Sequence, residues 1–155
     1  MPSEPGAPTA PVRGFTVAIE LHPRFRDTDA MGHINNAVYV TYIEVARQEY
    51  WLRLDGSQDY RQVPFILARV SCDFRSEALV SELLEIGIRC EWIGVKSFAF
   101  AYEIREKASR RLVVEAQSVQ VCYDYAVKRS IVMPEELRGA LEAFEGRRLA
   151  KTVQA

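Results

Sequence analysis

Cysteine and net charge are scarce in this 155-residue sequence, and each shortage excludes a class of protein. The three cysteines, Cys72, Cys90 and Cys122, cannot all pair with one another, and none has the CxxC or Cys/His spacing of a zinc site. We expect them to be small buried residues in a protein of a reducing compartment. The formal net charge of −1 gives no bulk attraction for nucleic acid or for an anionic membrane.

Long apolar runs are absent as well. No stretch approaches the roughly 18 residues that cross a bilayer, and the first residues lack the basic and apolar regions of a signal peptide. We therefore expect a cytoplasmic protein with no membrane span. What is present is a 48% hydrophobic composition over a length typical of one globular domain.

Proline and glycine are concentrated at one end. Residues 1–14 hold four of the seven prolines and two of the eight glycines, with almost no large apolar side chains. This composition predicts a disordered or extended tail. The domain is expected over residues 15–146, followed by a C-terminal tail over residues 147–155.

Apolar and polar residues alternate in five segments, which predicts strands at residues 15–21, 65–75, 83–93, 97–105 and 112–125. The residues predicted to face inward are Phe15, Val17, Ile19 and Leu21 in the first strand, and Ile66, Ala68, Val70, Cys72 and Phe74 in the second. In the third strand they are Leu84, Ile86, Ile88, Cys90 and Trp92, and in the fourth Phe98, Phe100, Tyr102 and Ile104.

Residues 37–54 follow a helical period instead, and their buried face is predicted to hold Tyr39, Tyr42, Ile43, Ala46 and Tyr50. Few polar residues interrupt the first half, so we expect this helix to be surrounded on most sides. Its expected N-cap is Asn35 or Asn36, and Asp55-Gly56 closes its other end.

A short amphipathic helix is predicted over residues 134–144, with Pro134 at its first position and Gly146 as its stop. The order of elements predicts an α+β fold, with one antiparallel five-stranded sheet against one long helix.

Residues 24–36 are the one segment where titratable groups, glycine and amides gather without an apolar period. Calcium binding by an EF-hand loop does not fit, because Met31 and Val38 stand where ligands are needed. A phosphoryl-transfer aspartate would follow an apolar run, whereas Arg24 and Arg26 precede Asp27. A zinc site from His22, Asp29 and His33 matches no recognised spacing.

A carboxylate just ahead of a helix N-terminus fits this segment better. Asp29 can serve as base or nucleophile, and the free N–H groups of the helix can stabilise a developing oxyanion. That pair of functions suits acyl transfer. The structural alternatives are that Asp29 only makes a turn, that His33 only packs the loop and that Asn35 and Asn36 are only caps.

The run D-T-D-A-M-G-H-I-N-N-A-V-Y, followed by a helix of the form Y-x-x-Y-x-E-x-A-R, resembles the signature of hotdog-fold acyl-CoA thioesterases of the 4-hydroxybenzoyl-CoA thioesterase type. The strand and helix order over residues 15–133 agrees with that family. The resemblance implies a hotdog fold, in which the sheet wraps around the helix, and hydrolysis of an acyl-CoA thioester to a free acid and coenzyme A.

The resemblance also implies roles for single residues. Asp29 corresponds to the catalytic carboxylate, a nucleophile or a general base, and the backbone N–H near Asn36 would polarise the thioester carbonyl. His33 is a supporting group, and Gly32 and Asn35 belong to the same substrate-contacting motif.

A second stretch, W-I-G-V-K-S-F, resembles one that lies near the coenzyme A nucleotide, which implicates Lys96 and Ser97. Arg129 sits where a basic residue can meet the phosphates. Gly94 departs from the family, because some relatives have a basic residue there. The alternative for Lys96 and Arg129 is that they are simple surface cations.

The remaining expectations concern partners and competing functions. We expect a homodimer, or a dimer of dimers, with active sites between subunits, and no metal or redox cofactor, since a thioester is already activated. Asp27 is expected to pair with Arg24 or Arg26, and Glu44 to line the pocket or bond across a subunit contact. A non-catalytic acyl-CoA-binding module and, less favoured, a hydratase or dehydratase using Glu44 are the alternatives.

Overall fold

The computed structural model describes residues 14–56 and 63–151 of the chain. The expected N-terminal tail lies outside these residues except for Gly14, as do residues 152–155 of the expected C-terminal tail. The elements in chain order are β1 (Val17–Leu21), the short 3-10 helix η1 (Phe25–Asp27), α1 (Val38–Asp55), β2 (Phe65–Phe74), β3 (Leu84–Ile93), β4 (Ser97–Glu106), β5 (Leu112–Asp124), β6 (Arg129–Ser130) and α2 (Glu135–Glu145).

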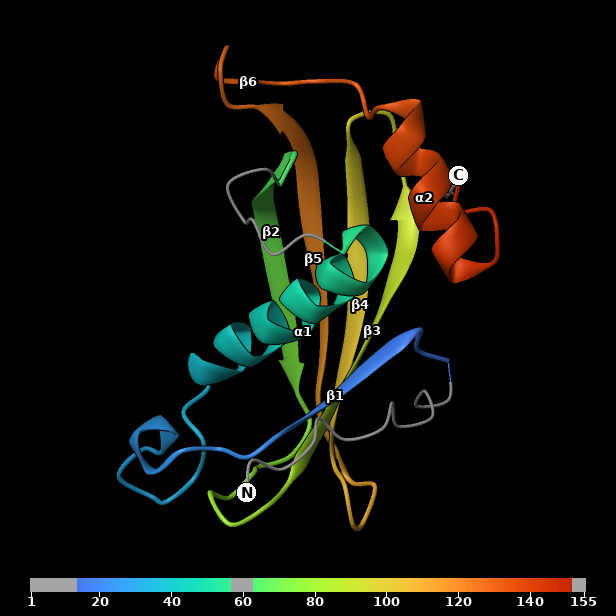
Figure 1. The fold of residues 1–155 in the computed structure, drawn as a ribbon. Coiled ribbons are helices and arrows are strands. Elements are labelled where there is room, and N and C mark those ends of the chain that lie inside the picture. The colour runs from blue at the N-terminus through green and yellow to red at the C-terminus, as the bar shows by residue number, and fades with distance from the viewer. Residues whose placement is uncertain (1–13, 57–62, 152–155) are drawn as a thin grey trace, which may run out of the picture.

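One antiparallel sheet runs in the order β1-β3-β4-β5-β2, and the two residues of β6 pair with β5. α1 crosses one face of this sheet obliquely and packs on β1 and β3 (Figure 1). α2 lies near the C-terminal end of α1 (Figure 1). The predicted architecture of five antiparallel strands, one long helix and a short C-terminal helix is confirmed.

The core lies between α1 and the sheet. The five predicted inward residues of α1 are all buried, and β3 and β4 contribute Leu84, Ile86, Ile88, Cys90, Phe98, Phe100, Tyr102 and Ile104. Aromatic rings form a chain of edge-to-face contacts through this core. Trp51 meets Phe65 at 5.1 Å between centroids, Phe65 meets Phe98 at 5.3 Å, and Phe98 meets Phe100 at 5.5 Å.

Three predictions of strand facing are wrong because regular alternation fails locally. The register of β2 shifts between Leu67 and Arg69, so Phe65 is buried while Ile66 and Ala68 do not join the core. A similar shift in β3 between Cys90 and Trp92 keeps Trp92 out of the core, and Ile93 is buried instead. Phe15 precedes β1 and lies on the outer face of the sheet, where its ring occupies the space that a side chain on Gly87 would need.

Helix caps also differ from the prediction. The N-cap of α1 is Ala37 rather than Asn35 or Asn36, and Pro134 is the N-cap of α2 rather than its first residue. Gly56 and Gly146 end the two helices in the left-handed conformation, as glycine permits.

α1 is not surrounded on most sides within this chain, because Val40 and Val45 remain 38% and 40% exposed. Glu44 on the same face is exposed rather than buried, and it does not line the pocket described below. Cys90 and Cys122 are buried as predicted, whereas Cys72 is only half-buried.

The chain remains packed on the domain after α2. Leu149 is buried, its carbonyl accepts the Ile93 N–H, and Ala150 forms a parallel bridge with Ile93. No helix of the described residues is both long and apolar enough to span a membrane.

Candidate functional site

A buried aspartate anchors the loop between β1 and α1. Asp27 is 3% exposed; its carboxylate accepts the Tyr42 hydroxyl at 2.6 Å, the Arg24 N–H at 3.0 Å and the Arg24 guanidinium at 3.2 Å. Burial alone would raise the pKa of Asp27, but the hydrogen bonds from Tyr42 and Arg24 hold it below its ordinary value. The predicted pairing with Arg24 is confirmed, and the hydrogen bond from Tyr42 ties the loop to the first half of α1.

Asp29 follows two residues later and is exposed. Its Oδ1 accepts the backbone N–H groups of Met31 at 2.8 Å and His33 at 3.2 Å. Gly32 completes this turn with a φ of 80°, a backbone conformation that glycine adopts without strain. Among the described residues Oδ2 has no hydrogen-bond donor, so the turn holds the carboxylate through one oxygen and leaves the other open.

The start of α1 presents a free donor beside this carboxylate. Asn35 Oδ1 accepts the Ala37 N–H at 3.1 Å, and the Asn35 carbonyl accepts the Val38 N–H at 2.9 Å. The N–H of Asn36 has no acceptor among the described residues. Asn35, two residues before the N-cap Ala37, therefore accepts two of the backbone N–H groups at the start of α1. The N–H of Asn36 stays available to a ligand.

These groups converge on a pocket of about 370 Å³ at the N-terminal end of α1. Its walls combine the β1–α1 loop, the first turn of α1 and the turn that follows β2. The lining residues are Asp29, His33, Ile34, Asn36, Tyr39, Phe74, Arg75, Ser76 and Glu77. The structure thus brings together the three predicted catalytic residues, while burial raises the pKa of Tyr39 to about 12 and keeps its hydroxyl neutral.

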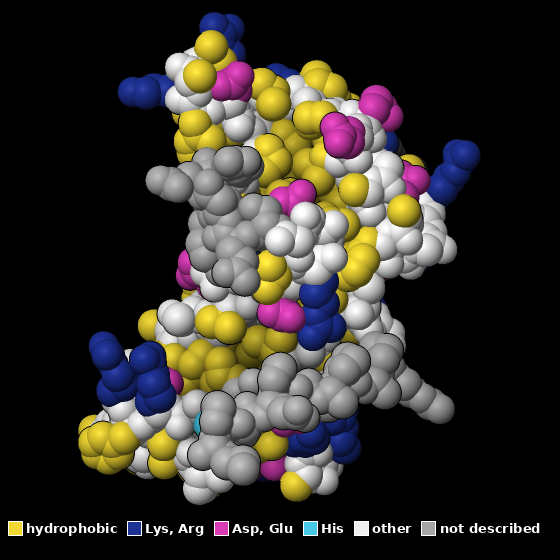
Figure 2. All heavy atoms as spheres, in the orientation of Figure 1, with side chains coloured by type: hydrophobic (Ala, Val, Ile, Leu, Met, Phe, Trp, Pro, Cys, Tyr) yellow, Lys and Arg dark blue, Asp and Glu magenta, His cyan; other side chains and the backbone are white. Residues whose placement is uncertain are grey.

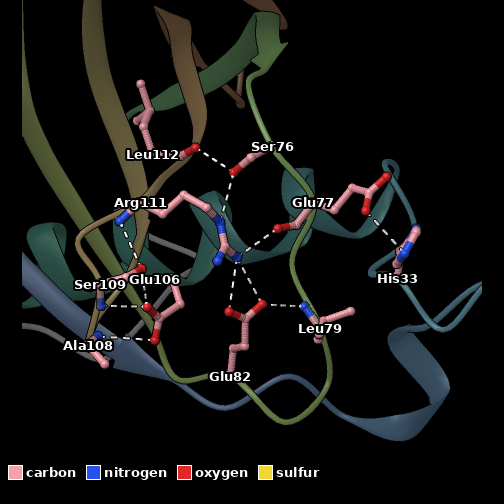
Figure 3. A network of polar contacts seen from close by, with 10 residues as sticks. All are labelled: His33, Ser76, Glu77, Leu79, Glu82, Glu106, Ala108, Ser109, Arg111 and Leu112. Carbon is pink, nitrogen blue, oxygen red and sulfur yellow. Dashed lines mark hydrogen bonds and ion pairs between the residues drawn. The ribbon is translucent and has the colours of Figure 1, made fainter.

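The turn after β2 contributes residues that the sequence did not point to. Glu77 Oε2 lies 3.2 Å from His33 Nε2 (Figure 3). The Ala78 carbonyl accepts the Ile34 N–H at 2.9 Å. No local motif marks Glu77, because it lies more than forty residues beyond His33. Only the sheet, which returns the end of β2 to the β1–α1 loop, brings the two together.

The residues predicted to contact the nucleotide lie elsewhere. Ser97 pairs with Val121 near one end of β5, whereas Phe74 in the pocket pairs with Val114. Val114 and Val121 are seven positions apart on β5, which corresponds to about 23 Å along the strand. Lys96, Ser97 and Arg129 therefore occupy the opposite end of the sheet, beside β6 and the β3–β4 turn (Figure 1).

A second hollow of about 310 Å³ lies between α1 and α2, where apolar atoms reach the surface (Figure 2). Trp51, Leu54, Pro64, Leu137 and Ala140 are among its lining residues. It contains none of the predicted site residues. Over residues 14–56 and 63–151, no group of three His, Cys, Asp or Glu side chains is arranged to hold a metal ion.

The site and fold have counterparts among known proteins. Residues 23–141 match the family model of the Thioesterase-like superfamily. A long-chain acyl-CoA thioesterase, FadM, from Escherichia coli K12 is 27% identical over 119 residues, covering 74% of this chain and 88% of that protein. The acyl-CoA thioesterase YbgC from Haemophilus influenzae is 25% identical over 131 residues, covering 82% and 93%.

A thioesterase from Thermus thermophilus, solved in complex with coenzyme A and Zn, superimposes with a TM-score of 0.80 at 31% identity. It matches 89% of this chain and 100% of its own. The sheet that holds one long helix against its face is the hotdog fold of these enzymes. On its sequence, its fold and the extent of these matches, the chain belongs to the Thioesterase-like superfamily.

Proposed function

We propose that the protein hydrolyses an acyl-CoA thioester to a free carboxylic acid and coenzyme A. The observation that carries this proposal is the convergence of Asp29, His33 and Asn36 on one pocket at the N-terminus of α1. Relatives named acyl-CoA thioesterases support the substrate class.

In this mechanism the thioester carbonyl lies between the Asp29 carboxylate and the Asn36 N–H. Asp29 Oδ2 either removes a proton from an attacking water or attacks the carbonyl carbon itself, which gives a mixed anhydride that water then hydrolyses. The carbon–sulfur bond breaks, and the coenzyme A thiolate leaves and takes up a proton. The Asn36 N–H stabilises the oxyanion, aided by the positive end of the α1 dipole.

The site residues already provide the functions that this reaction needs. A thioester is an activated acyl donor with a good leaving group, so we propose that turnover requires no metal or redox cofactor. Added chelator should leave the rate unchanged.

We also propose that two copies of the chain form the working unit in the cytoplasm, and that Lys96, Ser97 and Arg129 grip the nucleotide bound at the partner copy's site. Their separation from the pocket within one chain supports this arrangement. Exposed apolar side chains, Val40 and Val45 on α1 and Leu67 and Phe74 on the edge strand β2, offer the surface for pairing. Analytical ultracentrifugation should give the mass of a dimer or a tetramer.

The test is a panel of acyl-CoA thioesters, from short to long chains and including benzoyl types, assayed for the free thiol. We expect turnover of at least one class, and a fall in kcat of about 10²–10⁴-fold in Asp29→Asn, which keeps the turn but removes the charge. Binding without thiol release would instead indicate a non-catalytic module. Unchanged turnover in Asp29→Asn would exclude the proposed role of this carboxylate.

A further inference from the structure

We infer that Glu77 is a positioning residue for His33, and that Arg111 holds Glu77 in place. This inference rests on the proposed thioesterase function for its kinetic consequences, although the contact itself does not depend on it. Neither residue belongs to the motif of residues 27–36.

The contact joins one nitrogen of the imidazole to a carboxylate. His33 Nε2 lies 3.2 Å from Glu77 Oε2, and the His33 side chain is 28% exposed. Because a carboxylate has no proton to donate, this 3.2 Å contact favours the ring form in which Nε2 carries the proton and faces Glu77. In the neutral ring this makes Nδ1 the acceptor, available to water or substrate in the pocket.

Burial does not hold Glu77, whose side chain is 71% exposed. Its backbone is held instead by Arg111, at the junction between β4 and β5 (Figure 3). Arg111 Nη2 donates to the Glu77 carbonyl at 2.9 Å, and Nε donates to Ser76 Oγ at 3.2 Å. The Ser76 hydroxyl in turn donates to the Leu112 carbonyl at 2.6 Å.

The Arg111 guanidinium also binds the C-terminal part of the turn after β2, through Glu82. Arg111 Nη2 donates to both carboxylate oxygens of Glu82, at 2.9 and 3.0 Å, and Glu82 accepts the Leu79 N–H at 2.8 Å. Leu79 forms a bridge with His33 itself. One planar cation therefore fixes the backbone before and after Glu77, a geometry that a lysine ammonium does not reproduce.

This arrangement makes the position of His33 depend on Arg111, which does not line the pocket. The β1–α1 loop supplies His33, and the turn after β2 supplies its partner. Without Arg111 the backbone of Glu77 would lose its hydrogen bond, the carboxylate would shift relative to His33, and the imidazole would lose its preferred orientation. We expect the loss to appear in kcat rather than KM, since the contact of the Glu77 carboxylate is with His33.

The kinetic test uses Glu77→Ala and Glu77→Gln, each alone and combined with His33→Ala. Glu77→Ala should lower kcat about fivefold, the effect of one modest hydrogen bond, with KM within about twofold. Glu77→Gln should retain most of the activity because its amide oxygen can still accept from Nε2. In the His33→Ala background, Glu77→Ala should have no further effect. Arg111→Lys should behave like Glu77→Ala.

Glu49→Ala is the matched control, because Glu49 also forms an exposed ion pair, with Arg53 at 2.9 Å, but lies away from the pocket. It should leave kcat unchanged. The inference is overturned if Glu77→Ala is silent, if it lowers kcat equally with and without His33, or if Gln is no better than Ala.

A second readout needs no enzymatic activity. The chain has only two histidines, so 15N spectra of the neutral imidazoles report His33 with the exposed His22 as internal reference. Wild type and Glu77→Gln should hold the His33 proton on Nε2, whereas Glu77→Ala should show the tautomer mixture of His22. An inactive wild type with this spectral pattern would exclude the proposed function and keep the positioning role. The same mixture at His33 in wild type would exclude the positioning role.

Discussion

The β1–α1 loop and the β5–β6 hairpin contain similar local turns, each built on an aspartate. Asp124 Oδ1 accepts the N–H groups of Ala126 at 2.8 Å and Val127 at 3.3 Å, two and three residues later, whereas Asp29 Oδ1 accepts N–H groups two and four residues later. The surroundings differ. Asp29 shares a pocket with an imidazole and a helix N-terminus, whereas Asp124 stands opposite Arg129 in a two-residue ladder. The turn orients a carboxylate, and its neighbours decide what the carboxylate can do.

The largest expected difference between these regions is in kcat. Asn preserves the turn at both positions because its side-chain oxygen accepts the same N–H groups. Asp29→Asn should therefore lose about 10²–10⁴-fold in kcat, while Asp124→Asn stays within about twofold of wild type. Thiol release measured at saturating acyl-CoA distinguishes the two. Equal losses would show that the turn, and not the pocket, controls activity.

Replacing the anchor of the β1–α1 loop should have the next largest effect, and it should act on stability. Asp27→Ala leaves the Tyr42 hydroxyl and the Arg24 N–H without their acceptor, and we expect the free energy of unfolding to fall by about 2–3 kcal/mol. Urea unfolding measures this change. The β5–β6 hairpin has no equivalent buried acid among the described residues, so Asp124→Ala should not reproduce it.

The same anchor predicts a dependence on pH. Because the folded pKa of Asp27 is lowered from its ordinary value of 3.8, the unfolded chain binds the proton more readily. The stabilisation is complete above that value and is lost as the pH falls toward and through the lowered folded pKa. Unfolding free energies measured from neutral to acidic pH should fall less steeply for Asp27→Asn than for wild type. Parallel curves would contradict the assignment.

The smallest effect is expected from removing each turn. Asp29→Ala and Asp124→Ala should each lower the free energy of unfolding by only about 0.5 kcal/mol, since the freed N–H groups lie at exposed positions and can bond to water. Thermal melts of the two variants should nearly coincide. A much larger loss for Asp29→Ala would mean that its carboxylate is needed for folding of the loop as well as for chemistry.

Much of the fold was predictable because it depends on periodicity. Alternation over β3 and β4 identified residues that are buried, and the helical period identified the buried face of α1. The prediction failed at Ile66, where the register of β2 shifts, and at Phe15, which lies ahead of the bend at Thr16 that precedes β1. The cap of α1 was misplaced for a related reason, since Asn35 acts from outside the helix.

The candidate site was predictable where it is contiguous. Asp29, His33 and Asn36 lie within eight residues, and the motif around them locates all three. Glu77 and Arg111 were missed, since nothing in their own neighbourhoods distinguishes them from other surface charges. Their significance comes from the turn after β2, which brings Glu77 beside His33 and is itself held by Arg111.

The sequence by itself determined the local conformations: an Asx turn at Asp29, a left-handed glycine at position 32 and a helix directly after the loop. Each follows from short-range sterics and hydrogen bonding, which the neighbouring residues contain in full. Only the tertiary structure decided which carboxylate meets His33 and which end of the sheet carries Lys96 and Arg129. Those outcomes depend on strand order and register, which arise from packing between segments that are far apart in the chain.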